Sequence, residues 1–207
     1  MLNTSVAVIN ASTVLRDDDV AAAVPALQKQ VSEHLSAVWG VDATLNFVQR
    51  GASPPAGTWW LTILDNSDQA GSVGYHDLTN EGLPLGKVFA GSDMVNGYNW
   101  TVTASHELLE MLIDPDINRA VFIQDETGAG KLYAYEICDP CESDQYGYQM
   151  TEFWSLTLCF PHGLNRSGRR EAHSSTSCSK LHNRSNSSQA ATSTPTTLVP
   201  AEVAGSR

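Results

Sequence analysis

The hydrophobic positions of this chain follow two different spacings, and together they predict an α+β domain. Apolar residues three or four apart predict a helix over residues 17–39, which begins with three aspartates and ends at Gly40. Pro25 lies inside this helix and predicts either a kink or a later start. Short runs of β-branched and aromatic residues predict strands at 5–10, 44–49 and 58–64.

The spacing becomes helical again in the second half of the chain. A helix is predicted over about 99–113, and the pair Asp114-Pro115 ends it. Between the two helices, we interpret the Gly-rich stretch 71–86 as a loop that leads into an edge strand from Lys87 to Ala90. Further strands are predicted at 120–124 and 132–137, which flank a Gly-containing turn, and at 146–150.

We expect one folded domain over residues 1–152 and a disordered tail over residues 153–207. After about Phe153 the apolar periodicity fades, and residues 174–207 are dominated by Ser, Thr, Asn and small residues. Such a segment buries too little apolar surface to offset the entropy lost on ordering. Two origins of the tail are open: a natural flexible extension, or a reading frame that has slipped out of register after about Thr151.

The charge of the chain is negative and unevenly distributed. The formal net charge is −11, and residues 1–152 alone carry −15. Binding to phosphate groups needs Lys and Arg, so the acidic part argues against nucleic acid and anionic membrane surfaces as partners. The sequence has no basic leader and no apolar segment near the roughly 20 residues that span a bilayer, so we expect a soluble, cytoplasmic protein.

The segment TASHELLEMLIDP, residues 103–115, carries the strongest chemical signal. On a helix, residues four apart lie on one face, so His106 and Glu110 can converge on one metal ion with Glu107 beside it. In zinc helices of the His-Glu-x-x-His type, two turn-spaced residues hold the metal. The intervening Glu takes a proton from the bound water, whose pKa zinc lowers to about 7.

The alternative is an ordinary amphipathic helix whose polar stripe faces water. A solvated stripe usually mixes charges of both signs, yet no Lys or Arg occurs between Val88 and Asn118. Glu107 and Glu110 would repel each other without a cation, and a divalent ion would remove that repulsion. The missing basic residues therefore favour a metal site.

A zinc site needs at least a third protein ligand. Glu136 is the first candidate, because it alternates onto an apolar face of the strand predicted at 132–137, where a carboxylate is unfavourable unless paired or ligated. The alternative for Glu136 is a strand-end residue that points to water. Asp139 is the second candidate and His76 the third, although His76 and Asp77 are more typical of a turn-stabilising pair.

The helix SHELLEML, following a β-rich half with a predicted edge strand, resembles the active-site helix of the zincin-like metallopeptidases over roughly residues 5–114. The resemblance implies a zincin-like fold, with a small mixed sheet, a backing helix and an active-site helix. It implies one zinc ion with His106 and Glu110 as ligands and Glu107 as general base. It also implies a peptide or protein substrate that pairs with the edge strand from Lys87 to Ala90.

Glu110 departs from the common motif, which has His at this position. A carboxylate donates more charge to the metal and makes it a weaker Lewis acid, so metal binding is better supported than peptidase activity. We therefore expect a zinc-dependent hydrolase, in the first place a peptidase, with Glu136 as the third ligand. The alternatives are a non-catalytic module of the same fold that binds metal or peptide, and an interaction domain without metal.

Overall fold

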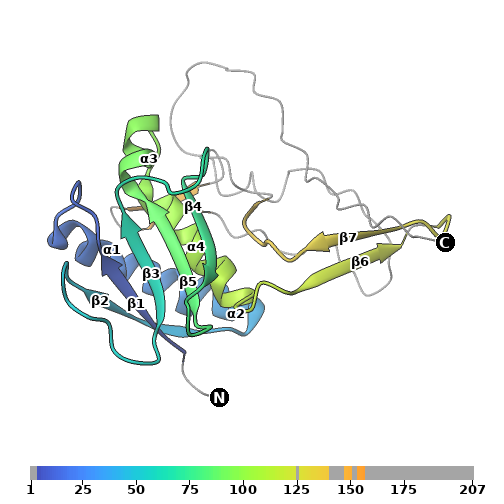
Figure 1. The fold of residues 1–207 in the computed structure, drawn as a ribbon. Coiled ribbons are helices and arrows are strands. Elements are labelled where there is room, and N and C mark those ends of the chain that lie inside the picture. The colour runs from blue at the N-terminus through green and yellow to red at the C-terminus, as the bar shows by residue number, and fades with distance from the viewer. Residues whose placement is uncertain (1–3, 125, 140–146, 151–152, 157–207) are drawn as a thin grey trace.

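The computed structural model describes residues 4–124, 126–139, 147–150 and 153–156. Its central sheet consists of β1 (Thr4–Asn10), β2 (Ala43–Val48), β3 (Trp59–Leu64), β4 (Gly74–Leu78) and β5 (Pro84–Phe89). The strands lie in the order β2-β1-β3-β5-β4, and β4 is antiparallel to β5 whereas the other neighbours are parallel (Figure 1). The expected α+β class with a small mixed sheet is confirmed.

The sheet buries one face in the main core of the protein. In β3, Leu61 and Ile63 are fully buried, whereas Thr62 between them is half-buried. This alternation follows from the period of two along a strand, and it places the larger apolar side chains on the face that the helices cover. Val88 of β5 continues the buried face next to Ile63, its partner in the strand register.

The helix predicted over residues 17–39 forms as one continuous run. It consists of α1 (Asp17–Lys29), a π-helical turn η1 (Gln30–Leu35) and α2 (Ser36–Trp39), and Gly40 ends it with a left-handed φ of 68°. The helix continues through Pro25, and its irregular part lies at η1. This run and α4 (Trp100–Ile113) lie on the same side of the sheet (Figure 1), joined by a 2.7 Å hydrogen bond from Ser105 Oγ to Gln30 Oε1.

The edge strand of the sheet differs from the one that the sequence predicted. The Gly-rich stretch 71–86, interpreted as a loop, contains β4 and the first part of β5. Because β5 lies between β3 and β4, the prediction of an edge strand from Lys87 to Ala90 is wrong. The edge strand on this side of the sheet is β4, and β2 forms the opposite edge. Ala90 instead begins α3 (Ala90–Asn96), which was also not predicted. Glycines and polar residues in β4 hide the apolar alternation by which strands are recognised.

Beyond α4 the predicted hairpin forms from β6 (Ala120–Gln124) and β7 (Gly130–Ala134), and it extends away from the sheet (Figure 1). A second antiparallel pair joins β8 (Gly147–Met150) to β9 (Phe153–Leu156). Strand β9 lies just beyond the domain boundary predicted at residue 152. The rest of the predicted tail, residues 157–207, lies outside the described residues.

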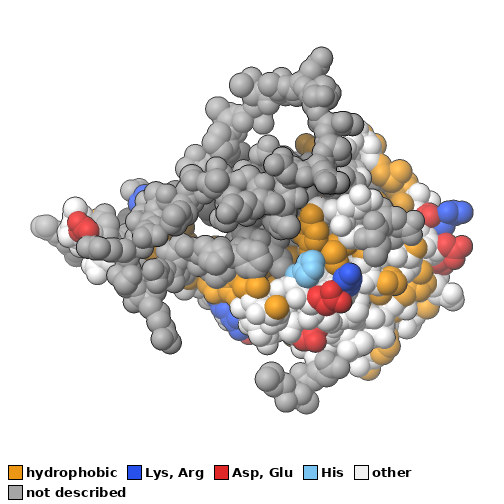
Figure 2. Space-filling view, turned by 180° about the vertical axis from the view of Figure 1, so that it is seen from behind, with side chains coloured by type: hydrophobic (Ala, Val, Ile, Leu, Met, Phe, Trp, Pro, Cys, Tyr) orange, Lys and Arg blue, Asp and Glu red, His pale blue; other side chains and the backbone are white. Residues whose placement is uncertain are grey.

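Two observations bear on the expectation that the protein binds neither membranes nor nucleic acid. In the part of the chain that the structure describes, no helix is both long and apolar enough to cross a membrane. On the face seen in Figure 2, the Lys and Arg side chains of the described residues lie singly among acidic and uncharged side chains.

Candidate metal centre

Helix α4 is buried around almost its whole circumference, including its polar stripe. The exposed fractions are 5% for Glu107, 3% for Glu110 and 4% for Asp114. Carboxylates are almost never buried to this degree unless they are paired, hydrogen-bonded or bound to a metal. The alternative of a solvated polar stripe is therefore wrong, because a side chain in that role would remain in water.

The residues of the His-Glu-x-x-Glu motif come together as the helical spacing predicts. Nε2 of His106 lies 3.0 Å from Oε2 of Glu110, one turn further along α4. Potential ligand atoms of His106, Glu107 and Glu110 all lie within 4.8 Å of one another.

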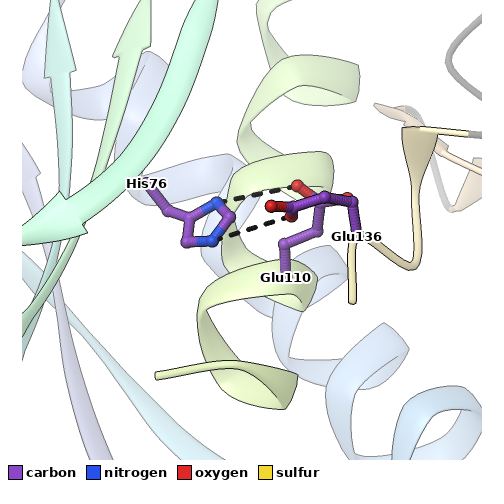
Figure 3. Close-up of side chains that lie close together, drawn as sticks. All are labelled: His76, Glu110 and Glu136. Carbon is purple, nitrogen blue, oxygen red and sulfur yellow. Dashed lines mark ion pairs between the residues drawn. The ribbon is translucent and has the colours of Figure 1, made fainter. Parts of the chain in front are cut away.

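A second group of potential ligands shares Glu110 with the first. His76 of β4 places Nδ1 3.6 Å from Oε2 of Glu110 and Nε2 3.7 Å from Oε2 of Glu136 (Figure 3). Ligand atoms of His76, Glu110 and Glu136 lie within 4.8 Å of one another. Glu110 therefore stands between an imidazole from its own helix and an imidazole from the edge strand.

Glycines in the sheet allow α4 to approach β4 and β5 closely. Gly74 and His76 lie on the same face of β4, since they are two residues apart. A Cβ atom added to Gly74 would lie 2.6 Å from Oε1 of Glu107, and one added to Gly86 would lie 3.5 Å from Cβ of Glu107. The missing side chains thus make room for the Glu107 carboxyl group against the sheet, next to His76.

The segment that follows β7 contributes further contacts to the residues of α4 and β4 in this centre. The backbone N–H of Cys138 donates a hydrogen bond of 2.9 Å to Oε1 of Glu110, while Oε2 of Glu110 faces the two imidazoles. Oδ1 of Asp139 lies 3.4 Å from Nε2 of His106. The same segment therefore orients Glu110 and brings Glu136 and Asp139 to the centre.

Glu136 lies in the centre, but not on the strand face that the sequence predicted for it. Strand β7 ends at Ala134, and Leu132 in it is 41% exposed, so the apolar strand face assumed for Glu136 does not exist. Glu136 instead lies in the segment that follows the strand, next to His76. Of the expected ligands, the structure places Glu136 with His76 and Glu110 in one group, and His106 with Glu110 in the other.

His76, the third ligand candidate from the sequence, lies in this cluster. Its side chain is only 8% exposed and points toward α4, whereas Asp77 is exposed and accepts a 2.7 Å hydrogen bond from the N–H of Leu78. His76 and Asp77 thus do not act together as a turn-stabilising pair. Within GYHDL, the polar and glycine residues left no apolar alternation that could have indicated a strand or the direction of the His76 side chain.

Burial makes the charged forms of the carboxyl groups unfavourable. It raises the pKa of Glu107, whose contact with His76 only partly opposes the effect. Burial, together with the negative charge of Glu110, raises the pKa of Glu136 to about 7. The thiol of Cys138 is fully buried, and burial raises its pKa well above the usual value. Among the described residues, neither group of potential ligands includes Cys138.

Both imidazoles have raised pKa values because of their carboxyl neighbours. Burial by itself lowers the pKa of each imidazole, but the neighbouring acids outweigh it. The largest of these contributions comes from Glu107 for His76 and from Asp139 for His106. In the absence of a cation, the cluster therefore retains protons that a divalent ion would displace.

The cluster fits a divalent metal ion in its chemistry. Nε2 of His76 and Oε2 of Glu136 are buried, and among the described residues neither has a hydrogen-bond partner. Buried polar atoms without partners are rare in folded proteins. Imidazole nitrogen and carboxylate oxygen are ordinary ligands of zinc, so a bound ion would give both atoms a partner.

Comparisons with protein-family models, curated proteins and solved structures found no match to this chain. The resemblance to the zincin-like metallopeptidases therefore rests on the residues of the helix motif and on the order of the elements alone.

Proposed function

We propose that this protein is a zinc-dependent hydrolase of zincin-like fold, and that its substrates are in the first place peptides. The observation that carries the proposal is the buried group around Glu110, in which imidazoles and carboxyl groups converge without a Lys or Arg partner among the described residues. The proposed ligands are His106, Glu110 and Glu136. Zinc bound there would lower the pKa of a coordinated water molecule to about 7 and polarise the scissile carbonyl group.

Glu107 is the proposed general base. Its carboxyl group lies next to His106 and Glu110, and with Glu136 as third ligand it is free to act as a base. Burial raises its pKa above the usual value. A base with a pKa near the working pH transfers protons most efficiently. In the proposed reaction, Glu107 accepts a proton from the attacking water and delivers it to the leaving amine.

Strand β4 supports the choice of peptides as substrates. Hydrogen bonds from Thr79 N to Leu83 O and from Phe89 N to Val73 O lie just beyond the two ends of the β4–β5 ladder. In the antiparallel pattern they imply that the backbone N–H and C=O of His76 point away from β5. In the described sheet no strand pairs with that side of β4.

An extended peptide added to this edge would run alongside the metal centre, because the side chain of His76 lies in it. The aligning role that the resemblance implied for the segment from Lys87 to Ala90 therefore passes, in this proposal, to β4.

The test compares zinc content and cleavage of a mixed library of internally quenched peptides. We expect about one or more zinc ions per wild-type chain after reconstitution, and cleavage that Glu107→Gln reduces by roughly 10²–10⁴-fold while zinc remains bound. Glu126→Gln, at an exposed position of the β6–β7 turn, is the matched control and retains both properties. Full activity of Glu107→Gln would contradict the proposal.

A non-catalytic metal-binding module is the second candidate, and the carboxylate at Glu110 favours it. A carboxylate ligand in place of the usual imidazole weakens the Lewis acidity of zinc. Stoichiometric zinc without cleavage of any library peptide would select this candidate. A wild-type protein that binds no zinc would exclude both.

A further inference from the structure

The proposed zinc ligands leave His76 without a role, although its imidazole lies inside the cluster. Its side chain is 8% exposed, compared with 14% for His106. In the described structure its Nε2 atom has no hydrogen-bond partner, and the atom faces Oε2 of Glu136, which is also buried without one. A buried imidazole nitrogen and a buried carboxylate oxygen 3.7 Å apart are spaced as two ligands of one ion would be.

Glu110 is shared by two groups of ligands that come from different directions. Its Oε2 atom lies 3.0 Å from His106 Nε2 on the α4 side and 3.6 Å from His76 Nδ1 on the β4 side. Carboxylates that lie between two metal ions are common in two-metal sites, where the ions are about 3.5–4 Å apart. One carboxyl group with an imidazole on each side has the layout of such a bridge.

The charge of the centre agrees with two divalent ions better than with one. Four carboxyl groups meet the two imidazoles: those of Glu107, Glu110, Glu136 and Asp139. The sequence offers no Lys or Arg between Val88 and Asn118, and no Lys or Arg ion pair to these acids occurs in the described part. Glu107 and Glu110 are buried and Glu136 is half-buried, whereas the Asp139 side chain is 43% exposed. A second divalent ion would offset the carboxylate charge that one ion leaves in the buried part of the cluster.

We propose that the centre binds two divalent metal ions, with Glu110 between them, His106 on one ion, and His76 and Glu136 on the other. This inference rests on the proposed metal-binding function and adds a second ion to it. In a two-metal site each ion can stabilise one of the oxygens involved in a hydrolytic displacement. His76 also ties the second ion to β4, the strand along which the substrate is proposed to pair.

The first measurement is the number of ions per chain, by native mass spectrometry and elemental analysis after reconstitution with Zn²⁺. We expect two ions in the wild type, one in His76→Ala, and two in Asp77→Ala. Asp77 is the matched control, because it is the exposed neighbour of His76 on the same strand. Two ions retained by His76→Ala, or a single ion in the wild type, would overturn the inference.

The second measurement needs no variant, so it stands even if His76→Ala does not fold. Imidazole and carboxylate ligands also bind Mn²⁺. In the wild type loaded with Mn²⁺, electron paramagnetic resonance is expected to show an exchange-coupled pair, whereas the hyperfine pattern of isolated ions alone would contradict the second ion. A wild type with one Zn²⁺ ion and Glu107-dependent cleavage would overturn this inference but support the proposed function. A wild type that binds no metal would contradict both the inference and the proposed function.

Discussion

Single residues in the candidate metal centre owe their properties to burial rather than to their chemical type. Glu136 is an ordinary glutamate in sequence, yet its surroundings raise its pKa from 4.5 to about 7. The pairing of His106 with Glu110 was predictable, because both lie one turn apart on one helix. His76 could not be predicted with the same certainty, since its approach to Glu110 depends on the packing of β4 against α4.

The pKa of Glu136 leads to a prediction about stability in the absence of metal. Its folded-state pKa lies above the unfolded value. The stability from this group is therefore fully present below about pH 4.5 and is lost as the pH rises through about 7. We expect the metal-free wild type to lose about 3 kcal/mol of unfolding free energy between pH 4.5 and 8 from this group. Both imidazoles, whose pKa values are also raised, change stability in the same direction.

Glu136→Gln removes the titrating group, so a comparison with the wild type isolates the contribution of Glu136 to the pH dependence of the unfolding free energy. We expect the metal-free variant to be more stable than the wild type at pH 8, although it binds zinc more weakly. Urea unfolding with a chelator at pH 5 and pH 8 measures the difference, and Glu126→Gln is the exposed control. The same pH dependence in Glu136→Gln and the wild type would show that Glu136 is not buried as described.

At the level of elements, the centre depends on how closely the edge strand and the helix pack. Gly74 in β4 and Gly86 in β5 face α4, and their missing side chains leave room for Glu107. Helical periodicity predicted α4, and short runs of β-branched and aromatic residues predicted β1 and β3. The same rule failed for β4, because its inward positions at Gly74 and His76 carry no apolar side chain.

Gly74→Ala tests this packing. The new Cβ would lie 2.6 Å from Oε1 of Glu107 and equally close to Cγ2 of Thr103, so the helix or the strand must shift. We expect a loss of about 1–3 kcal/mol in unfolding free energy and a displaced Glu107, which would reduce hydrolysis more than zinc binding. Urea unfolding and the peptide assay measure the two effects, with Asp77→Ala on the exposed side of β4 as control. Wild-type stability and activity in Gly74→Ala would contradict the close approach.

At the level of the whole molecule, the candidate metal centre joins three parts of the chain that are distant in sequence. His76 comes from the edge strand, His106 and Glu110 from α4, and Glu136 from the segment after the β6–β7 hairpin. The acidic character of residues 1–152, with a net charge of −15, would attract cations to the protein as a whole. An ion bound where these parts meet would therefore hold them together, in addition to any catalytic role.

Removal of metal is expected to lower the thermal stability of the whole domain. An ion present at about 1,000 times its dissociation constant stabilises the folded state by about 4 kcal/mol, which for a domain of this size corresponds to roughly 10 °C in Tm. Differential scanning fluorimetry with excess zinc and with a chelator measures the shift. His106→Ala, which removes the imidazole ligand of one ion, is expected to show a smaller shift than the wild type. An equal shift in His106→Ala would place the stabilising ion elsewhere.

The sequence by itself determined the features that depend on neighbours along the chain. These are the two long helices, most strands, the convergence of His106 and Glu110, and the absence of basic residues around them. Only the tertiary structure decided which strand forms the edge, that the polar stripe of α4 is buried, and that His76 and Glu136 meet at Glu110. The physical reason is that helix and strand periodicity act over a few residues. Strand order, burial and the meeting of distant side chains depend on how the elements pack, which no local pattern encodes.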